Sequence, residues 1–236
     1  MKKLNKKVSI VTNVILLAVF TLVFAVSFIP ENTLPIYGGQ GITAIYNGNR
    51  ANAKVSLMFN VYENTEIVNS IIDTLDENNA KATFFVGGCW ADDNAKTLIR
   101  ILNSGHEIAN HGYFHKDHKN LNHEKNREEI YTTGVIVKAL CGADMNLFAP
   151  PSGSYSTTTL EVADKLGYKV IMWSKDTIDW RDKDVKKVFS RATEKVSNGD
   201  LILMHPKEHT LLALPAILSY YKSIGLSVVT VSDNLI

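Results

Sequence analysis

This chain of 236 residues contains only two cysteines and carries almost no net charge. The two cysteines, Cys89 and Cys141, lack the CxxC spacing of thiolate metal sites and of thioredoxin-type redox sites, so both classes are excluded. The sequence leaves open whether the two thiols pair in a disulfide or stay separate. A formal net charge of only +1 gives no electrostatic basis for a nucleic-acid partner.

A carboxylate is missing at a place where α/β proteins usually carry their chemistry. Residues 54–59, KVSLMF, predict a buried strand. The turn after it offers Asn60, Val61 and Tyr62, with no carboxylate before Glu63. Because active sites form at such strand ends, this absence bears directly on whether the protein is an enzyme.

The N-terminus combines a lysine cluster with a long apolar run. Lys2, Lys3, Lys6 and Lys7 precede residues 8–29, which contain only five polar residues: Ser9, Thr12, Asn13, Thr21 and Ser27. This pattern predicts a transmembrane signal anchor over residues 1–30, with the rest of the chain exported. The alternative is a signal peptide cleaved near AVS at 25–27, which would give a secreted protein. Residues 31–52, rich in Gly and Asn, are predicted to be a lead-in to one domain over residues 53–236.

Strand-like and helix-like segments alternate from residue 54 onward. Strands are predicted at 54–59, 81–88, 106–110, 146–149, 169–174, 200–205 and 227–232. Helices are predicted at 65–79, 94–105, 124–140, 157–166, 183–197 and 209–223. The alternation predicts an α/β fold, a (β/α) barrel of about seven parallel strands behind the N-terminal transmembrane helix, with an open doubly wound sheet as the alternative.

Polar residues follow several of these strands. Asn60, His111, Pro150, Asp176 and His205 come at or just after predicted strand ends. Since parallel strands of a barrel end on one face, residues far apart in sequence are expected to meet there.

Histidines dominate the candidate chemistry. His111 and His115, four residues apart in NHGYFH, could share a metal ion if they lie on one helical turn, or could be an ordinary surface pair. His118 and His123 lie in HKDHKNLNHEKN, which is typical of a solvated face. His205 could act as a general acid if a carboxylate orients it, or could simply cap its strand.

Acidic and aromatic residues in WSKDTIDW could complete such a site. Asp176 or Asp179 could orient His205, and Trp180 could stack on a sugar ring or belong to the core. The stiff loop LFAPPSGSYS could direct backbone N–H groups toward an oxyanion, or serve only as a connection.

Five segments in chain order, KATFFVGG, GHEIANHGYFH, WSKDTIDW, GDLILMHP and VVTVSDNL, resemble the polysaccharide deacetylase family, the NodB-homology domain of carbohydrate esterases. The resemblance covers about residues 50–234 and is nearest to the sporulation-associated, membrane-anchored group. It implies a distorted (β/α) barrel and a zinc-like divalent metal. It also implies removal of N-acetyl groups from N-acetylglucosamine or N-acetylmuramic acid in peptidoglycan or chitin-like glycan.

The same resemblance assigns roles to single residues. It implies that His111 and His115 bind the metal, that His205 is the general acid and that Asp179 orients it. The residues that it implies for substrate binding are Trp180, Leu203, Ser152, Pro151 and Tyr155.

The resemblance fails at the stretch after the first strand. Asn60 stands where the family has its catalytic base, Val61 where it has a metal-binding aspartate, and Ala149 where it has an arginine. Glu63 or Glu66 could replace the lost carboxylates in a hydrolase with a degenerate site and a weakly held metal. The alternative is a catalytically inactive, metal-free pseudoenzyme that binds cell-wall glycan in wall or spore-envelope assembly.

Overall fold

The computed structural model describes Leu17, Thr21 and residues 41–236. The predicted anchor, residues 1–30, falls outside the described residues apart from those two, as do residues 31–40 of the lead-in. Within the described part of the chain, no helix is both long enough and apolar enough to cross a bilayer.

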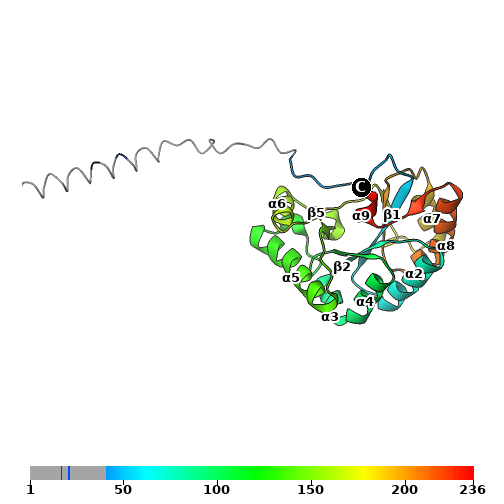
Figure 1. Ribbon diagram of the computed structural model, residues 1–236, viewed down its shortest axis with the longest axis horizontal. Helices are drawn as coiled ribbons and strands as arrows, with labels where there is room; N and C mark the ends of the chain where they lie inside the picture. Colours follow the sequence, from blue (N-terminus) through cyan, green and yellow to red (C-terminus); the bar gives the residue numbers. More distant parts are fainter. Residues whose placement is uncertain (1–16, 18–20, 22–40) are drawn as a thin grey trace, which may run out of the picture. The chain divides into compact units, whose positions relative to one another are not determined.

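A parallel sheet forms the centre of the domain (Figure 1). Its strands run in the order β5-β4-β3-β2-β1-β7-β6, with β8 paired to the start of β1. The bounds are β1 Lys54–Val61, β2 Thr83–Val86, β3 Glu107–Asn110, β4 Leu147–Phe148, β5 Lys169–Val170, β6 Lys175–Asp176, β7 Leu201–Met204 and β8 Ser227–Val228. In the described residues the end strands β5 and β6 do not pair with each other. The sheet is therefore a half-barrel of seven parallel strands plus β8, which confirms the predicted α/β class.

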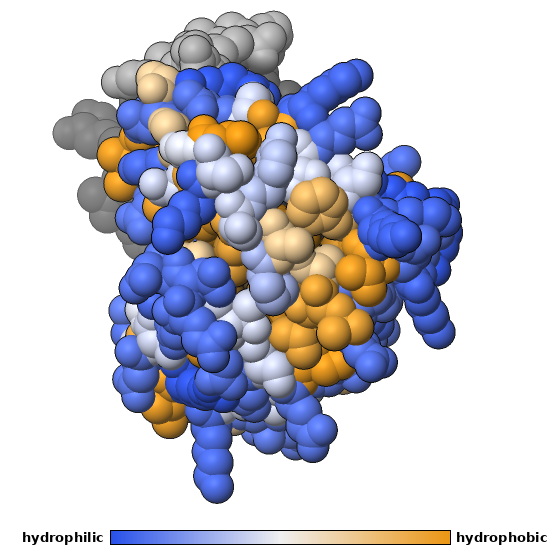
Figure 2. Space-filling model, turned by 90° about the vertical axis from the view of Figure 1, so that its right-hand side faces the viewer, coloured by the Kyte–Doolittle hydropathy of each residue, from blue (hydrophilic) through white to orange (hydrophobic). Residues whose placement is uncertain are grey.

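Helices lie around the outside of the sheet (Figure 1). They are α2 Thr65–Glu77, α3 Gly88–Asp93, α4 Ala95–Asn103, α5 His123–Cys141, α6 Thr157–Lys165, α7 Val185–Thr193, α8 Glu208–Ser223 and α9 Val231–Asn234, with 3₁₀ turns η1 His118–Asn120 and η2 Pro151–Gly153. On the side that carries α7 and α8, apolar residues gather at the surface (Figure 2), and Val185, Leu212 and Tyr220 are exposed there.

Strand β1 divides the core into two layers. Its odd-numbered residues, among them Phe59 and Val61, belong to the large apolar cluster between the sheet and the helices. Met58 belongs to a smaller cluster on the inner face of the sheet. Because side chains alternate along a strand, Asn60 shares the inner face with Met58, and this alternation places it in the site described below.

Two predicted strands end earlier than the sequence suggests. The segment predicted as one strand at 169–174 stops at Val170, and a separate short strand, β6, follows. The last predicted strand, 227–232, stops at Val228. There, Thr230 accepts a hydrogen bond from the backbone N–H of Asp233 and begins α9, because a threonine N-cap favours a helix over a continued strand.

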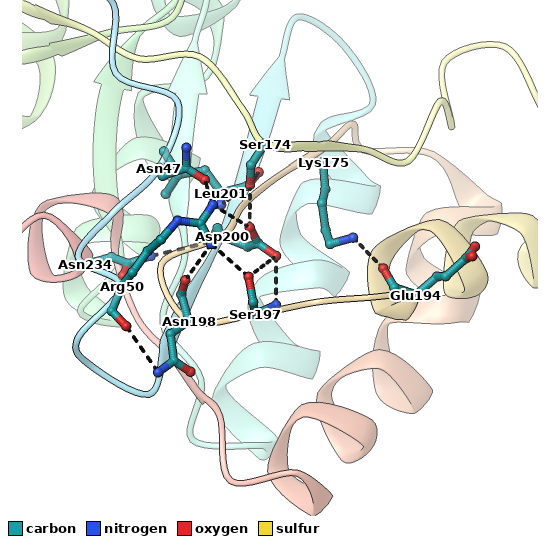
Figure 3. Close-up of polar contacts among 10 residues, drawn as sticks. All are labelled: Asn47, Arg50, Ser174, Lys175, Glu194, Ser197, Asn198, Asp200, Leu201 and Asn234. Atoms are coloured by element: carbon teal, nitrogen blue, oxygen red, sulfur yellow. Dashed lines mark hydrogen bonds and ion pairs between the residues drawn. The ribbon is translucent and has the colours of Figure 1, made fainter.

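A buried carboxylate organises the end of the barrel at which β7 begins (Figure 3). Asp200 accepts hydrogen bonds from Ser174 Oγ at 2.9 Å and from the Ser197 backbone N–H at 2.8 Å. The Arg50 guanidinium lies 3.8 Å from the Asp200 carboxylate. Asn47 forms a β-bridge with Asp200, and Ile45 forms one with Ile171. Residues of the predicted lead-in therefore pair with the chain just after β5 and just before β7.

Candidate active site

A cavity of about 450 Å³ lies at the C-terminal ends of the strands. Its lining consists of Asn60, Tyr62, Glu63, His111, His115, Ser152, Trp173, Asp176, Trp180, Leu203, His205, Pro206 and Lys207. Most of the residues proposed from the sequence thus converge on one place. Tyr62, Trp173, Pro206 and Lys207 are additions that the sequence analysis did not propose.

Three proposed residues lie elsewhere in the described chain. Pro151 is buried at the start of η2, and Tyr155 shares a 2.8 Å hydrogen bond between hydroxyl groups with Tyr46. Glu66 is exposed in the first turn of α2 and does not line the cavity. Glu63 does line it, but its carboxylate is paired with the Lys207 ammonium. Neither glutamate is placed as a free replacement for the missing carboxylates.

His205 and Asp179 form a closely bonded dyad. The His205 Nδ1 and backbone N–H donate to the two Asp179 carboxylate oxygens, each at 2.7 Å, and Thr210 Oγ1 donates at 2.6 Å. Burial acts to raise the pKa of Asp179, but hydrogen bonds from His205 and Thr210 outweigh it and lower the pKa. The ionised carboxylate fixes the His205 tautomer and leaves Nε2 as the nitrogen for cavity chemistry. Asp179, rather than Asp176, is therefore the partner of His205.

His111 and His115 lie together as a neutral pair. His111 is buried and its Nδ1 donates to the Ala149 carbonyl oxygen at 2.7 Å, which leaves Nε2 without a proton. Burial lowers the pKa of His111 to about 3 and also lowers that of His115. The ring centroids are 5.3 Å apart.

The prediction that His111 and His115 lie on one helical turn is wrong. Residues 111–117 form an irregular loop, in which Gly112 and His115 have φ values of 73° and 56°. A right-handed helical turn contains no residues with positive φ, so the two histidines are brought together by the loop and not by a helix.

Glu129 of α5 holds the histidine loop, and the sequence analysis missed it. Its Oε2 accepts hydrogen bonds from the backbone N–H groups of Tyr113 at 2.8 Å and Phe114 at 2.7 Å. A sequence signal existed, because Glu129 lies on the same helical stripe as the buried Asn126 and Thr133.

His118 contradicts the predicted solvated face. It is fully buried, its Nδ1 is 2.8 Å from Asn126 Oδ1, and its ring packs 5.0 Å from that of Phe148. The polar residues around it in the sequence belong to a surface turn, while α5 covers the histidine itself. His123, in contrast, is exposed at the start of α5.

The end of β1 presents an amide where a base would stand. Asn60 faces the cavity, is 5% exposed, and its Oδ1 has no hydrogen-bond partner among the described residues. Val61 points away into the apolar cluster on the helix side. Ala149 is fully buried on the inner face of the sheet.

The side chain of Tyr62 takes the space beside the two histidines. Its ring centroid lies 5.7 Å from that of His111 and 4.8 Å from that of His115. Its hydroxyl is 3.1 Å from the Gly112 carbonyl oxygen and donates to the Tyr113 carbonyl oxygen at 2.7 Å.

The side chains present do not fit a resident metal ion. Catalytic zinc sites take three protein ligands, but only two imidazoles meet here. The residue that would supply a carboxylate, Val61, is an aliphatic side chain in the core. In the part of the chain that the structure describes, no three His, Cys, Asp or Glu side chains are grouped to hold a metal.

The fold and site thus define an α/β half-barrel with a histidine pair and a His–Asp dyad at its strand ends. The model of one family, polysaccharide deacetylase, matches residues 47–171. The chain belongs to this family.

Similar curated relatives include an uncharacterized protein and an enzyme. An uncharacterized Bacillus subtilis protein, YlxY, is 33% identical over 80% of this chain and 59% of its own length, so the chain spans less than two thirds of that relative. A peptidoglycan-N-acetylglucosamine deacetylase of Bacillus cereus is 30% identical over 78% of this chain and 69% of its own length.

A solved structure points to loss of activity within the family. The structure of a CE4 family pseudoenzyme from Bacillus anthracis matches with a TM-score of 0.80 and 31% identity, over 82% of this chain and 69% of the other. A mutant of that pseudoenzyme has restored enzymatic activity.

Proposed function

We propose that this protein is a glycan-binding member of the polysaccharide deacetylase family that no longer hydrolyses its ligand. The observation that carries the proposal is the end of β1, where Asn60 faces the cavity and Val61 is buried in the core. Asn60 cannot accept a proton, and loss of a general base costs about 10²–10⁴-fold in rate. The similarity to a Bacillus anthracis pseudoenzyme supports the same interpretation.

The cavity itself remains suited to a sugar. Tyr62, Trp173 and Trp180 line it, and Trp180 is 56% exposed. Aromatic faces of this kind pack against the apolar face of a pyranose, while polar groups at the strand ends orient its hydroxyl and acetamido groups. The named substrates of the enzymatic relatives make N-acetylated peptidoglycan the proposed ligand. The lysine cluster and apolar run at the N-terminus support a membrane-anchored, extracytoplasmic location, where this glycan lies.

A second function, slow hydrolysis, is favoured by one observation only. The His205–Asp179 dyad is intact, with its 2.7 Å hydrogen bond, and could still protonate a leaving amine. Hydrolysis would also need a base and an activated water, and Asn60 cannot supply the base. Of the two carboxylates that line the cavity, Glu63 is paired with Lys207 and Asp176 accepts a hydrogen bond from the Ile178 backbone N–H.

Binding and acetate release by the full chain, purified in mild detergent, separate the two functions. We expect oligomers of N-acetylglucosamine to bind in calorimetry without release of acetate, with or without added zinc or cobalt. Acetate release that disappears in His205→Ala would instead establish the hydrolase.

Trp180→Ala tests the location of the ligand. We expect it to weaken oligomer binding at least about tenfold, or about 1.4 kcal/mol, because tryptophan stacking is lost. Tyr131→Ala is the matched control, since Tyr131 is similarly exposed (48%) but lies on α5 outside the cavity lining. Equal effects of both substitutions would contradict the assigned site.

A further inference from the structure

We infer that Tyr62 excludes divalent metal ions from the His111–His115 pair, so that restoring carboxylates without removing Tyr62 does not rebuild a metal site. The inference concerns metal binding in the absence of glycan. It therefore stands or falls separately from the proposed glycan-binding function.

The first argument is the space that the Tyr62 ring occupies. The ring contacts both imidazoles edge-on, with centroids 5.7 Å and 4.8 Å away, on the wall of the same cavity. A metal ion sits about 2.0–2.1 Å from each imidazole nitrogen and needs further ligands around it. The aromatic carbons of Tyr62 cannot serve as ligands, and they occupy the side from which the end of β1 would supply one.

The second argument is that Tyr62 is held by a hydrogen bond at its hydroxyl and by close packing against Gly87. Its hydroxyl donates to a carbonyl oxygen of the histidine loop, that of Tyr113. Its ring lies so close to Gly87 that a Cβ on that residue would be 2.2 Å from the ring. The ring therefore cannot move toward β2 and cannot leave the loop without breaking a hydrogen bond.

The third argument is the direction of the side chain at position 61. Consecutive side chains of an extended chain point to opposite faces. Val61 ends β1 and alternates with Asn60, so it points into the apolar cluster, where it is fully buried; the packed bend at Tyr62 that follows holds it in this direction. An aspartate placed at position 61 would enter that cluster instead of reaching His111 and His115.

Zinc loading of the full chain in mild detergent tests the inference. The variants are wild type, Val61→Asp, Tyr62→Gly, the double variant, and Tyr62→Phe as a control that keeps the ring. Each is incubated with zinc, desalted and assayed by mass spectrometry for zinc per chain, and calorimetry with zinc gives the affinity. Circular dichroism verifies folding.

We expect wild type, Val61→Asp and Tyr62→Phe to retain almost no zinc, and the double variant to bind about one ion per chain. Adding His111→Ala and His115→Ala to the double variant should abolish that binding. Stoichiometric zinc in wild type, equal loading of Val61→Asp and the double variant, or a folded double variant without zinc would each overturn the inference. If the double variant does not fold, Tyr62→Gly alone decides, because it should bind zinc at least about tenfold more tightly than wild type.

Discussion

Asp179 and Asn60 are buried polar side chains of the same site, but only the oxygens of Asp179 have hydrogen-bond donors. Each Asp179 carboxylate oxygen accepts at least one hydrogen bond, from His205 or Thr210. The Asn60 Oδ1 accepts none from the described residues. An unsatisfied buried acceptor destabilises the free protein, and a ligand that donates to it gains that energy on binding. We therefore expect the acetamido N–H or a sugar hydroxyl to meet Asn60.

Asp179→Asn should lower the free energy of unfolding by about 2–4 kcal/mol in urea at neutral pH. The two Asp179 oxygens together accept three hydrogen bonds, two from His205 and one from Thr210. An amide has only one acceptor oxygen, so at least one of these donors loses its partner. Asp73→Asn is the control, because Asp73 is paired but largely exposed, and should change stability by less than about 1 kcal/mol.

The same carboxylate predicts a pH dependence. The pKa of Asp179 is lower in the folded state than its ordinary value of 3.8, so the unfolded chain binds the proton more readily. Its stabilising contribution is complete above pH of about 4 and is lost as the pH falls through the folded pKa. Urea denaturation of Asp179→Asn should show a smaller acid-induced loss than wild type, and parallel curves would contradict the assignment.

At the scale of elements, the end of β1 and the start of α3 are fitted to each other through Tyr62 and Gly87. Gly87 has an ordinary extended backbone, φ −74° and ψ 140°, so its lack of a side chain is required by space and not by conformation. The strand ends and the histidine loop thus form one packed unit.

Gly87→Ala should destabilise the protein by about 1–3 kcal/mol, because its methyl group would overlap the Tyr62 ring. In a Tyr62→Ala background the same change should cost less than about 1 kcal/mol, since the ring is gone. Urea denaturation of the four proteins in this cycle measures the coupling. Additive effects would show that the two residues do not press on each other.

The helices and strands also show which parts of the fold could be predicted from the sequence. Apolar strands and amphipathic helices predicted the α/β class and about seven parallel strands, because burial patterns such as that of α2 are local. They predicted a barrel, and the absence of pairing between β5 and β6 in the described residues makes it a half-barrel. The break after Val170 and the cap at Thr230 depend on short-range hydrogen bonds that propensity does not capture. The position of Tyr62 could not be predicted, because it results from contacts among three segments distant in sequence.

At the scale of the whole molecule, the two ends of the barrel differ in chemistry. The cavity lies where the strands end, and the Asp200 cluster lies where β7 begins (Figure 3). In barrels of this kind the first end carries function and the opposite end carries stability.

Asp200→Ala should therefore lower the free energy of unfolding by about 1–3 kcal/mol, because the partly exposed donors of Ser174 and Ser197 lose their buried acceptor. Glycan affinity, measured by calorimetry well below the melting temperature, should stay unchanged. Asp144→Ala is the control, because Asp144 is paired with Lys138 but is 84% exposed. It should leave both the free energy of unfolding and the glycan affinity nearly unchanged. A parallel loss of affinity in folded Asp200→Ala would show that the two ends are coupled.

The packing of the Tyr62 ring beside His111 and His115 also has an evolutionary consequence. An aspartate at position 61 alone would be buried among apolar groups, and a glycine at position 62 alone would leave a hole beside the histidines. Each single step back toward an enzyme lowers stability before it can yield any activity. Under the proposed function, a return to catalysis would therefore require the two substitutions together, which acts as an evolutionary ratchet.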